Sequence, residues 1–208
     1  MQTLPTVVLI HDDDHFCQST ATLVSSVGLR IVRLASGGIY LRDFGAGHSG
    51  CVVIDLGKPK LEGMQLLEEL FRSPLRSPVI GIVSHVDVST VIRALRHGVS
   101  AVLQIQHASN TELLDAIQAA IAKDARQRAS HSRGEEIQSL FDSLSATEWA
   151  VLELLMHGDE LTVVAEKLEV SRRTVESRRA RVMNKLGVKS FTALVALLLE
   201  QGHFHDDA

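Results

Sequence analysis

The densest cluster of potential ligand side chains is the run from His11 to His15, in which three aspartates separate two histidines. Imidazole and carboxylate groups together can bind a transition metal. The run follows an apolar, strand-like segment and precedes an amphipathic, helix-like one. Since His11 then ends a strand and His15 begins a helix, the two imidazoles need not converge. The competing interpretation is an acidic pocket beside a helix whose N-cap is Asp13 or Asp14.

A second chemical signal is basic charge near the C-terminus. The chain has a formal net charge of −4, yet residues 171–190 carry seven Lys and Arg side chains and one acidic side chain, Glu176. A basic segment within an acidic chain is the electrostatic signature of nucleic-acid binding. The alternative is a solvated helix face that carries charge and has no partner.

This basic segment is predicted to form one helix over 172–186, with Ser171 as N-cap. Val175, Val182 and Leu186 share one face, which must pack against the preceding helices. The opposite face suits the major groove of DNA, where base edges present distinct donors and acceptors. Base contacts are predicted for Glu176, Ser177 and Ala180. Phosphate contacts, which set affinity rather than sequence, are predicted for Thr174, Arg178, Arg181, Lys185 and Lys189.

The elements that position these residues begin with alternating patterns in the first 125 residues. Short apolar runs cover 7–10, 31–34, 51–54, 79–83 and 101–105. Amphipathic segments cover 15–27, 37–44, 64–71, 88–96 and 111–125. Strand then helix, five times over, predicts an α/β, doubly wound, five-stranded parallel sheet. In such a sheet the chemistry lies outside the carboxyl ends of the strands.

The C-terminal part reads as all helix. Ser145 and Glu148 form a capping box before a helix that ends near His157. Further helices are predicted over 162–168, 172–186 and 191–201, which gives an all-α, four-helix helix-turn-helix domain. The polar stretch 123–134 predicts the frayed end of a helix and a linker, followed by a short helix over 135–141. We therefore expect domains at 1–122 and 141–208, joined by a helical linker at 123–140.

Composition narrows the function classes. Hydrophobic residues make up 45% of the chain, enough for a real core. Two cysteines, Cys17 and Cys51, give no disulfide framework. Without a signal sequence or a stretch of about 20 apolar residues, we expect a cytoplasmic protein and no membrane partner. No nucleophile–base pair or phosphate loop indicates an enzyme.

The C-terminal residues resemble the LuxR-type helix-turn-helix from Leu144 to Gly202. The matching motifs are Leu144-Ser-Ala-Thr-Glu148, Val170-Ser171, Thr174-Val175-Glu176 and Met183-Asn-Lys-Leu-Gly-Val188. Arg178 stands where the family usually has His, and both can donate to phosphate. The resemblance implies double-stranded DNA as partner and a homodimer, at least on DNA. The dimer contact would use Thr192, Ala193, Val195, Ala196 and Leu199, unless these residues only close the core.

Residues 5–122 resemble the receiver domain of FixJ/NarL-type response regulators. Asp55 ends the third predicted strand in Val52-Val-Ile-Asp-Leu56, with Pro59 and Gly63 following. The resemblance implies that Asp55 is the phosphoacceptor and a histidine kinase its donor. It also implies a possible Mg²⁺ ion held by Asp12 and Asp55, because Mg²⁺ prefers oxygen ligands. No other cofactor is expected.

The pocket nonetheless departs from the receiver pattern. The family's acidic pair falls on His11 and Asp12, unless a slip of one residue uses Asp12 and Asp13. The switch hydroxyl, aromatic and lysine fall on Val83, Val102 and Ile105, with Ser84 beside the first. A phosphorylated Asp55 would then lack a cation to pair with. Phosphorylation would therefore add few contacts that favour one conformation of the domain over the other.

We therefore expect a DNA-binding transcription regulator with atypical control that depends weakly on phosphorylation. One alternative is an ordinary phosphorylation-activated regulator that uses Asp55. Another is a protein-docking module that has lost DNA binding.

Overall fold

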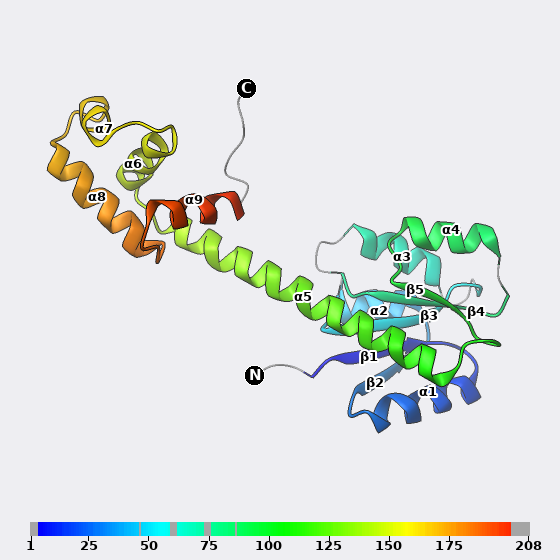
Figure 1. Cartoon of the computed structure of the whole chain (residues 1–208). Coiled ribbons are helices and arrows are strands. Elements are labelled where there is room, and N and C mark those ends of the chain that lie inside the picture. The colour runs from blue at the N-terminus through cyan, green and yellow to red at the C-terminus, as the bar shows by residue number, and fades with distance from the viewer. Residues whose placement is uncertain (1–3, 46, 59–61, 73–75, 86, 201–208) are drawn as a thin grey trace. The chain divides into compact units, whose positions relative to one another are not determined.

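The computed structural model describes residues 4–45, 47–58, 62–72, 76–85 and 87–200. It separates into two compact units, residues 1–129 and 130–208, and Figure 1 shows the elements of each. Pro59 and the side chain of Leu199, both used in the sequence interpretation, lie outside the described residues.

The first unit is a five-stranded sheet in which every pair of neighbouring strands is parallel. The strands are β1 (Thr6–Ile10), β2 (Arg30–Leu34), β3 (Gly50–Asp55), β4 (Val79–Val83) and β5 (Ala101–Gln104). Their order in the sheet is β2-β1-β3-β4-β5. This order confirms the predicted doubly wound α/β class. β1, β3 and β4 are buried almost throughout, which explains their continuous apolar sequences.

Helices cover both faces of this sheet (Figure 1). They are α1 (Asp14–Ser26), α2 (Gly37–Phe44), α3 (Gly63–Phe71), α4 (Val88–Arg96) and α5 (Asn110–Asp142). Tyr40 of α2, Leu66 of α3 and Ala94 of α4 join one core cluster. Cys17 of α1 and Ile117 of α5 join the cluster on the other face.

The prediction of a helix end and linker in the polar stretch 123–134 is wrong. The structure has one continuous helix, α5, from Asn110 to Asp142, where a helix ending near 125, a linker and a short helix over 135–141 were expected. The stretch contains three Arg and two Ala residues, which favour helix, and a single interior glycine such as Gly134 costs only about 1 kcal/mol. His131 and Glu135, one turn apart, also pair at 3.3 Å.

A buried polar network lies at the edge of the sheet opposite the carboxyl ends of the strands. The Tyr40 hydroxyl lies 2.8 Å from Nδ1 of His48 and 3.0 Å from Oγ of Ser77. The backbone N–H of Gly50 donates to Asp124 at 2.9 Å, and Arg128 pairs with the same carboxylate. These contacts tie α5 to the beginning of β3.

The second unit contains α6 (Ala146–Met156), α7 (Leu161–Lys167), α8 (Arg172–Lys185) and α9 (Phe191–Glu200). The predicted capping box at the start of α6 is confirmed, with Ser145 and Glu148 bonded reciprocally. Val182 and Leu186 pack with Phe141 of α5 and Leu194 of α9 in one cluster. None of the helices in the described part of the chain has the length and hydropathy to cross a bilayer.

Candidate functional site

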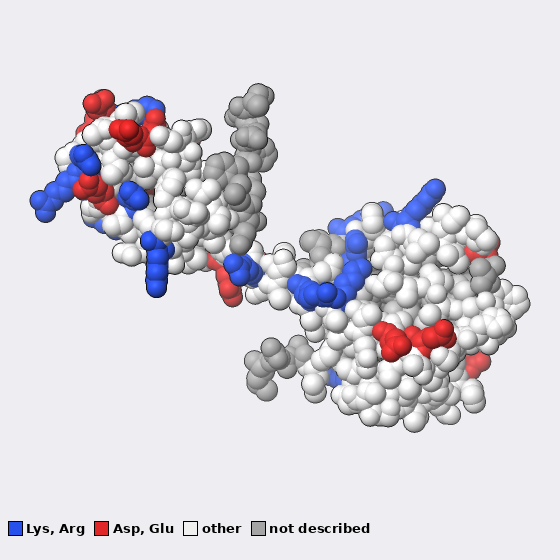
Figure 2. All heavy atoms as spheres, in the orientation of Figure 1, with Lys and Arg blue, Asp and Glu red and all other residues white. Residues whose placement is uncertain are grey.

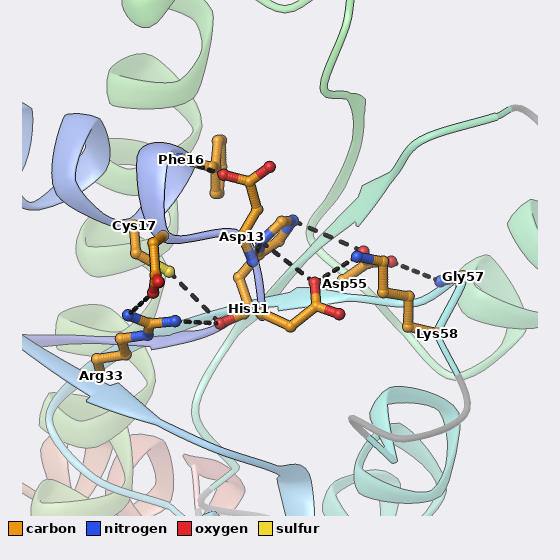
Figure 3. A network of polar contacts seen from close by, with 10 residues as sticks. His11, Asp13, Phe16, Cys17, Arg33, Asp55, Gly57 and Lys58 are labelled. Atoms are coloured by element: carbon orange, nitrogen blue, oxygen red, sulfur yellow. Dashed lines mark hydrogen bonds and ion pairs between the residues drawn. The ribbon is translucent and has the colours of Figure 1, made fainter.

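The polar pocket of the first unit lies where β1 and β3 end. Asp55 is the last residue of β3 and is fully buried. The register pairs Ile10 with Ile54, so His11 follows β1 directly opposite Asp55. Nε2 of His11 lies 3.6 Å from Oδ2 of Asp55 (Figure 3). The ungapped assignment of His11 to the pocket agrees with this register.

The hydrogen bonds of His11 define its tautomer. The backbone N–H of Asp13 donates to Nδ1 at 3.0 Å, so the neutral ring carries its hydrogen on Nε2. Burial lowers the pKa of His11 and so favours this neutral form. The nearby Asp55 charge has the opposite but smaller effect on the pKa. Phe16 packs against the ring with centroids 4.6 Å apart. A neutral imidazole therefore points an N–H toward the Asp55 carboxylate.

Asp13 lies outside the pocket itself. Its Oδ1 accepts the backbone N–H of Phe16 at 2.8 Å, which makes it the N-cap of α1. This hydrogen bond also lowers the pKa of its carboxyl group. Of the two sequence alternatives, the pocket therefore uses His11 and Asp12, and the one-residue slip to Asp12 and Asp13 is wrong.

A cation that sequence reasoning missed lies beside the pocket. Lys58, three residues after Asp55, forms an ion pair with Asp12 through Nζ (Figure 3). The hydrogen bond from Lys58 lowers the pKa of Asp12, and the same bond raises the pKa of Lys58. The expectation that no cation is available was incomplete. The missed signal was a lysine just beyond the carboxyl end of a buried strand, at the edge where the acidic residues gather.

Among the described residues, His11, Asp12 and Asp55 form a group that could hold a metal ion. Their potential ligand atoms lie within 4.8 Å of one another. The contacts of these residues do not fit a resident divalent ion. Nδ1 of His11 accepts a backbone N–H and Nε2 carries a hydrogen, so neither nitrogen offers a free lone pair. Asp12 is already neutralised by Lys58, and Oδ1 of Asp55 accepts the Gly57 N–H at 2.8 Å. Oδ2 of Asp55 is buried without a hydrogen-bond partner among the described residues, but one open oxygen does not make a divalent site.

The three departed switch positions are apolar and packed. Val83 ends β4 and is buried, and Val102 of β5 packs against the same core cluster. Ile105 packs against the cluster on the other face, and its backbone N–H donates to Val83 at 3.0 Å. Ser84 is half-buried beside Val83. At these positions the described residues supply no charged partner for Asp55.

The second candidate site is the outward face of α8. Ser171 caps this helix by accepting the N–H of Thr174 at 3.2 Å. Val175 and Val182 are buried on its inner face, as predicted. Glu176, Ser177 and Ala180 are exposed on the outer face. Glu176 pairs with Arg172 at 3.1 Å, one turn earlier. Figure 2 shows Lys and Arg side chains projecting from this unit.

The residues predicted for phosphate contact differ in their exposure and in their partners. Arg181 and Lys189 are exposed, while Thr174 and Arg178 are half-buried. Lys185 is different, because its Nζ donates to the Ser143 carbonyl at 2.9 Å and to Glu148 at 2.7 Å. Its ammonium is engaged in the fold of its own domain, so we assign Lys185 a structural role in place of the predicted phosphate contact.

Family comparisons describe both units. The receiver domain of response regulators matches residues 7–118, more than half of the chain. The family of bacterial regulatory proteins of the luxR type matches residues 142–198.

Relatives with both parts match nearly the whole chain. The transcriptional regulatory protein FixJ of Azorhizobium caulinodans is 31% identical over 97% of this chain and 94% of its own length. Nodulation protein W of Bradyrhizobium diazoefficiens is 31% identical over 92% of this chain and 84% of its own. The low-resolution structure of response regulator StyR superposes with a TM-score of 0.86 at 28% identity, covering 95% of this chain and all of StyR.

Proposed function

Because the chain belongs to the response regulators that join a receiver domain to a LuxR-type DNA-binding domain, it is a DNA-binding transcription regulator, and we propose that its receiver domain acts without the cation-dependent phosphorylation switch. The observation that carries this proposal is the pair of contacts around Asp55. Lys58 neutralises Asp12, and His11 offers an N–H in place of a carboxylate.

The physical consequence is that phosphorylation of Asp55 has little means of favouring one conformation of the receiver domain over another. A covalent modification shifts a two-state equilibrium only by the contacts it makes in one state and not in the other. The positions that the resemblance assigns to a hydroxyl and a lysine for the phosphoryl group hold the apolar side chains of Val83 and Ile105. With Lys58 already paired, few new charge-assisted hydrogen bonds are available to it.

The decisive experiment treats the full chain with acetyl phosphate, with and without Mg²⁺. Mass spectrometry would follow phosphorylation of Asp55, and fluorescence anisotropy would follow affinity for a generic duplex. We expect little phosphorylation and no more than a small change in affinity. Stoichiometric phosphorylation of Asp55 with a large gain in affinity would instead favour the ordinary phosphorylation-activated regulator, with Mg²⁺ on Asp12 and Asp55 and a histidine kinase as donor.

For DNA recognition we assign base contacts to Glu176, Ser177 and Ala180, whose exposure on one face of α8 supports the assignment. Phosphate contacts are assigned to the remaining predicted residues, Thr174, Arg178, Arg181 and Lys189. Neutralising phosphates releases counterions, so log affinity should fall linearly with log salt. A flat salt profile would favour the protein-docking alternative.

Dimerisation is assigned to α9. Leu194 and Leu198 are buried within the unit, whereas Thr192, Ala193 and Ala196 are exposed and free to meet a second copy. Sedimentation in the presence of a duplex with two half-sites tests this, and a strict one-to-one complex would contradict it.

A further inference from the structure

A pocket of about 290 Å³ lies between α1 and the turn that joins β5 to α5. Its floor is apolar and includes Phe16, Ile82, Ile105 and Leu113. Its rim is polar and includes Ser19 and Asn110, together with the ionisable side chains of Asp13 and His15. An apolar floor below polar groups that can fix a ligand's orientation is a composition found in small-molecule sites. Ile105 stands where the resemblance expects lysine, so the wall carries no cation at this position.

The charges around this pocket restrict its occupant. Its described lining contains no Lys or Arg, and its ionisable side chains are Asp13 and His15. Each helix N-terminus beside it already has a side-chain cap: Asp13 accepts the N–H of Phe16, and Ser109 and Glu112 bond reciprocally. An anion would meet the Asp13 carboxylate, and among the described lining residues no Lys or Arg would offset that charge. Phosphates and carboxylates are therefore poor candidates, and an uncharged molecule fits.

The size of the pocket sets a second limit. An engineered apolar cavity of about 150 Å³ binds benzene. A volume of 290 Å³ leaves room for a substituted single ring or a branched chain of similar bulk. Such a molecule would place its apolar body on the floor and a hydroxyl or amide group at the rim.

The pocket is in contact with the surroundings of Asp55. Phe16 lines it and also packs on His11, whose Nε2 faces Asp55 (Figure 3). Ile82 lines it too and is the register partner of Asp55 in the sheet. A ligand that moves Phe16 or Ile82 therefore changes the packing around the Asp55 carboxylate directly.

We propose that this pocket binds a small uncharged molecule with an apolar body and one hydrogen-bonding group, and that this ligand is an input to the receiver domain. The inference rests on the proposed phosphorylation-independent control. It supplies the chemical class of signal that such control requires.

The test uses two probes of similar shape and different charge: benzyl alcohol and benzoate. Binding to the full chain is followed by NMR of the isoleucine methyl groups. We expect benzyl alcohol to shift Ile82 and Ile105 saturably, with a dissociation constant of about a millimolar for so small a fragment. Benzoate should cause no saturable shift. No response to benzyl alcohol, or an equal response to benzoate, would overturn the proposal.

Variants locate the binding. Ala108→Phe fills the pocket from the β5–α5 side, and Ser19→Phe fills it from the exposed surface of α1. Both should abolish the benzyl alcohol shifts, whereas Ala125→Phe, on an exposed part of α5, should keep them. Ser19→Phe serves as the test if the other substitution impairs folding. Shifts that persist in a folded pocket-filling variant would overturn the location. This readout is independent of phosphorylation, so the two proposals can fail separately.

Discussion

Nε2 of His11 lies 3.6 Å from Oδ2 of Asp55, while Nδ1 of the same ring accepts the backbone N–H of Asp13. One residue thereby replaces a carboxylate with an N–H donor and is held in that tautomer by the backbone. The neighbouring Asp12 is neutralised by Lys58. The charge of Asp12 is therefore offset by Lys58, whereas the Asp55 carboxylate faces a neutral imidazole.

The first prediction restores metal binding. His11→Asp combined with Lys58→Met supplies a second carboxylate oxygen and removes the competing ammonium. We expect Mg²⁺ affinity to rise at least about tenfold, or about 1.4 kcal/mol. The rise is measured by calorimetry against the unsubstituted chain. Lys58→Met alone is the control and should give a smaller gain, because His11 still offers no lone pair. Equal Mg²⁺ affinity in all three proteins would contradict the interpretation of the pocket.

The second prediction separates two lysines of the DNA-binding unit. Lys185→Met removes the partner of Glu148 and Ser143. It should lower the melting temperature of the unit by several degrees and leave the salt slope of DNA binding unchanged. Lys189→Met should leave the melting temperature unchanged and reduce the salt slope by about 1. The reverse pattern would return Lys185 to the phosphate contacts.

The third prediction concerns the stability of the DNA-binding unit at acidic pH. Hydrogen bonds from Lys185 and Ser145 lower the pKa of Glu148 to about 2. A carboxyl group with a depressed pKa contributes stability above its ordinary value of 4.5, and this stability is lost as the pH falls from there toward about 2. Fluorescence of Trp149, the single tryptophan, reports unfolding. Glu148→Gln should flatten this acid dependence, and an unchanged acid profile would refute the assignment.

The fourth prediction concerns the titration of Tyr40, in the first unit, at alkaline pH. Burial raises the pKa of Tyr40, the single tyrosine, to about 12. A buried phenol that must stay neutral costs stability as the pH rises above its ordinary value of 10. Phenolate absorbance should therefore appear near pH 12 in the folded chain. In denaturant it should appear near the ordinary value. Coincident titrations would show that the hydroxyl is not held in its buried network.

The fifth prediction compares two glycines with positive φ. A Cβ on Gly50, at φ 133°, would lie 2.0 Å from the Thr6 carbonyl oxygen, whereas a Cβ on Gly28, at φ 75°, would meet nothing within 4 Å. Gly28→Ala should cost about 1–3 kcal/mol of unfolding free energy, from backbone strain alone. Gly50→Ala should cost more, because β1 and β3 must also separate. Denaturant unfolding measures both, and similar costs would contradict the argument.

Much of the fold followed from periodicity and caps. The continuous apolar runs predicted β1, β3 and β4, because strands buried on both faces need no polar side. The Ser145–Glu148 capping box predicted the start of α6. The helix α5 was predicted wrongly because a polar stretch with a glycine reads as a linker in isolation. The N-terminal part of α5 packs into one core through Ile117, and its C-terminal part packs into another core through Phe141.

The sequence by itself determined the two domain types, the position of Asp55 at the end of β3 and the outward face of α8. These depend on local spacing, which the chain carries in its order of residues. Only the tertiary structure decided what each charged side chain contacts. Lys58 pairs with Asp12 and Lys185 with Glu148 across 46 and 37 residues. Such pairs form when separate elements meet, and the physical role of a charge depends on the partner that it finds there.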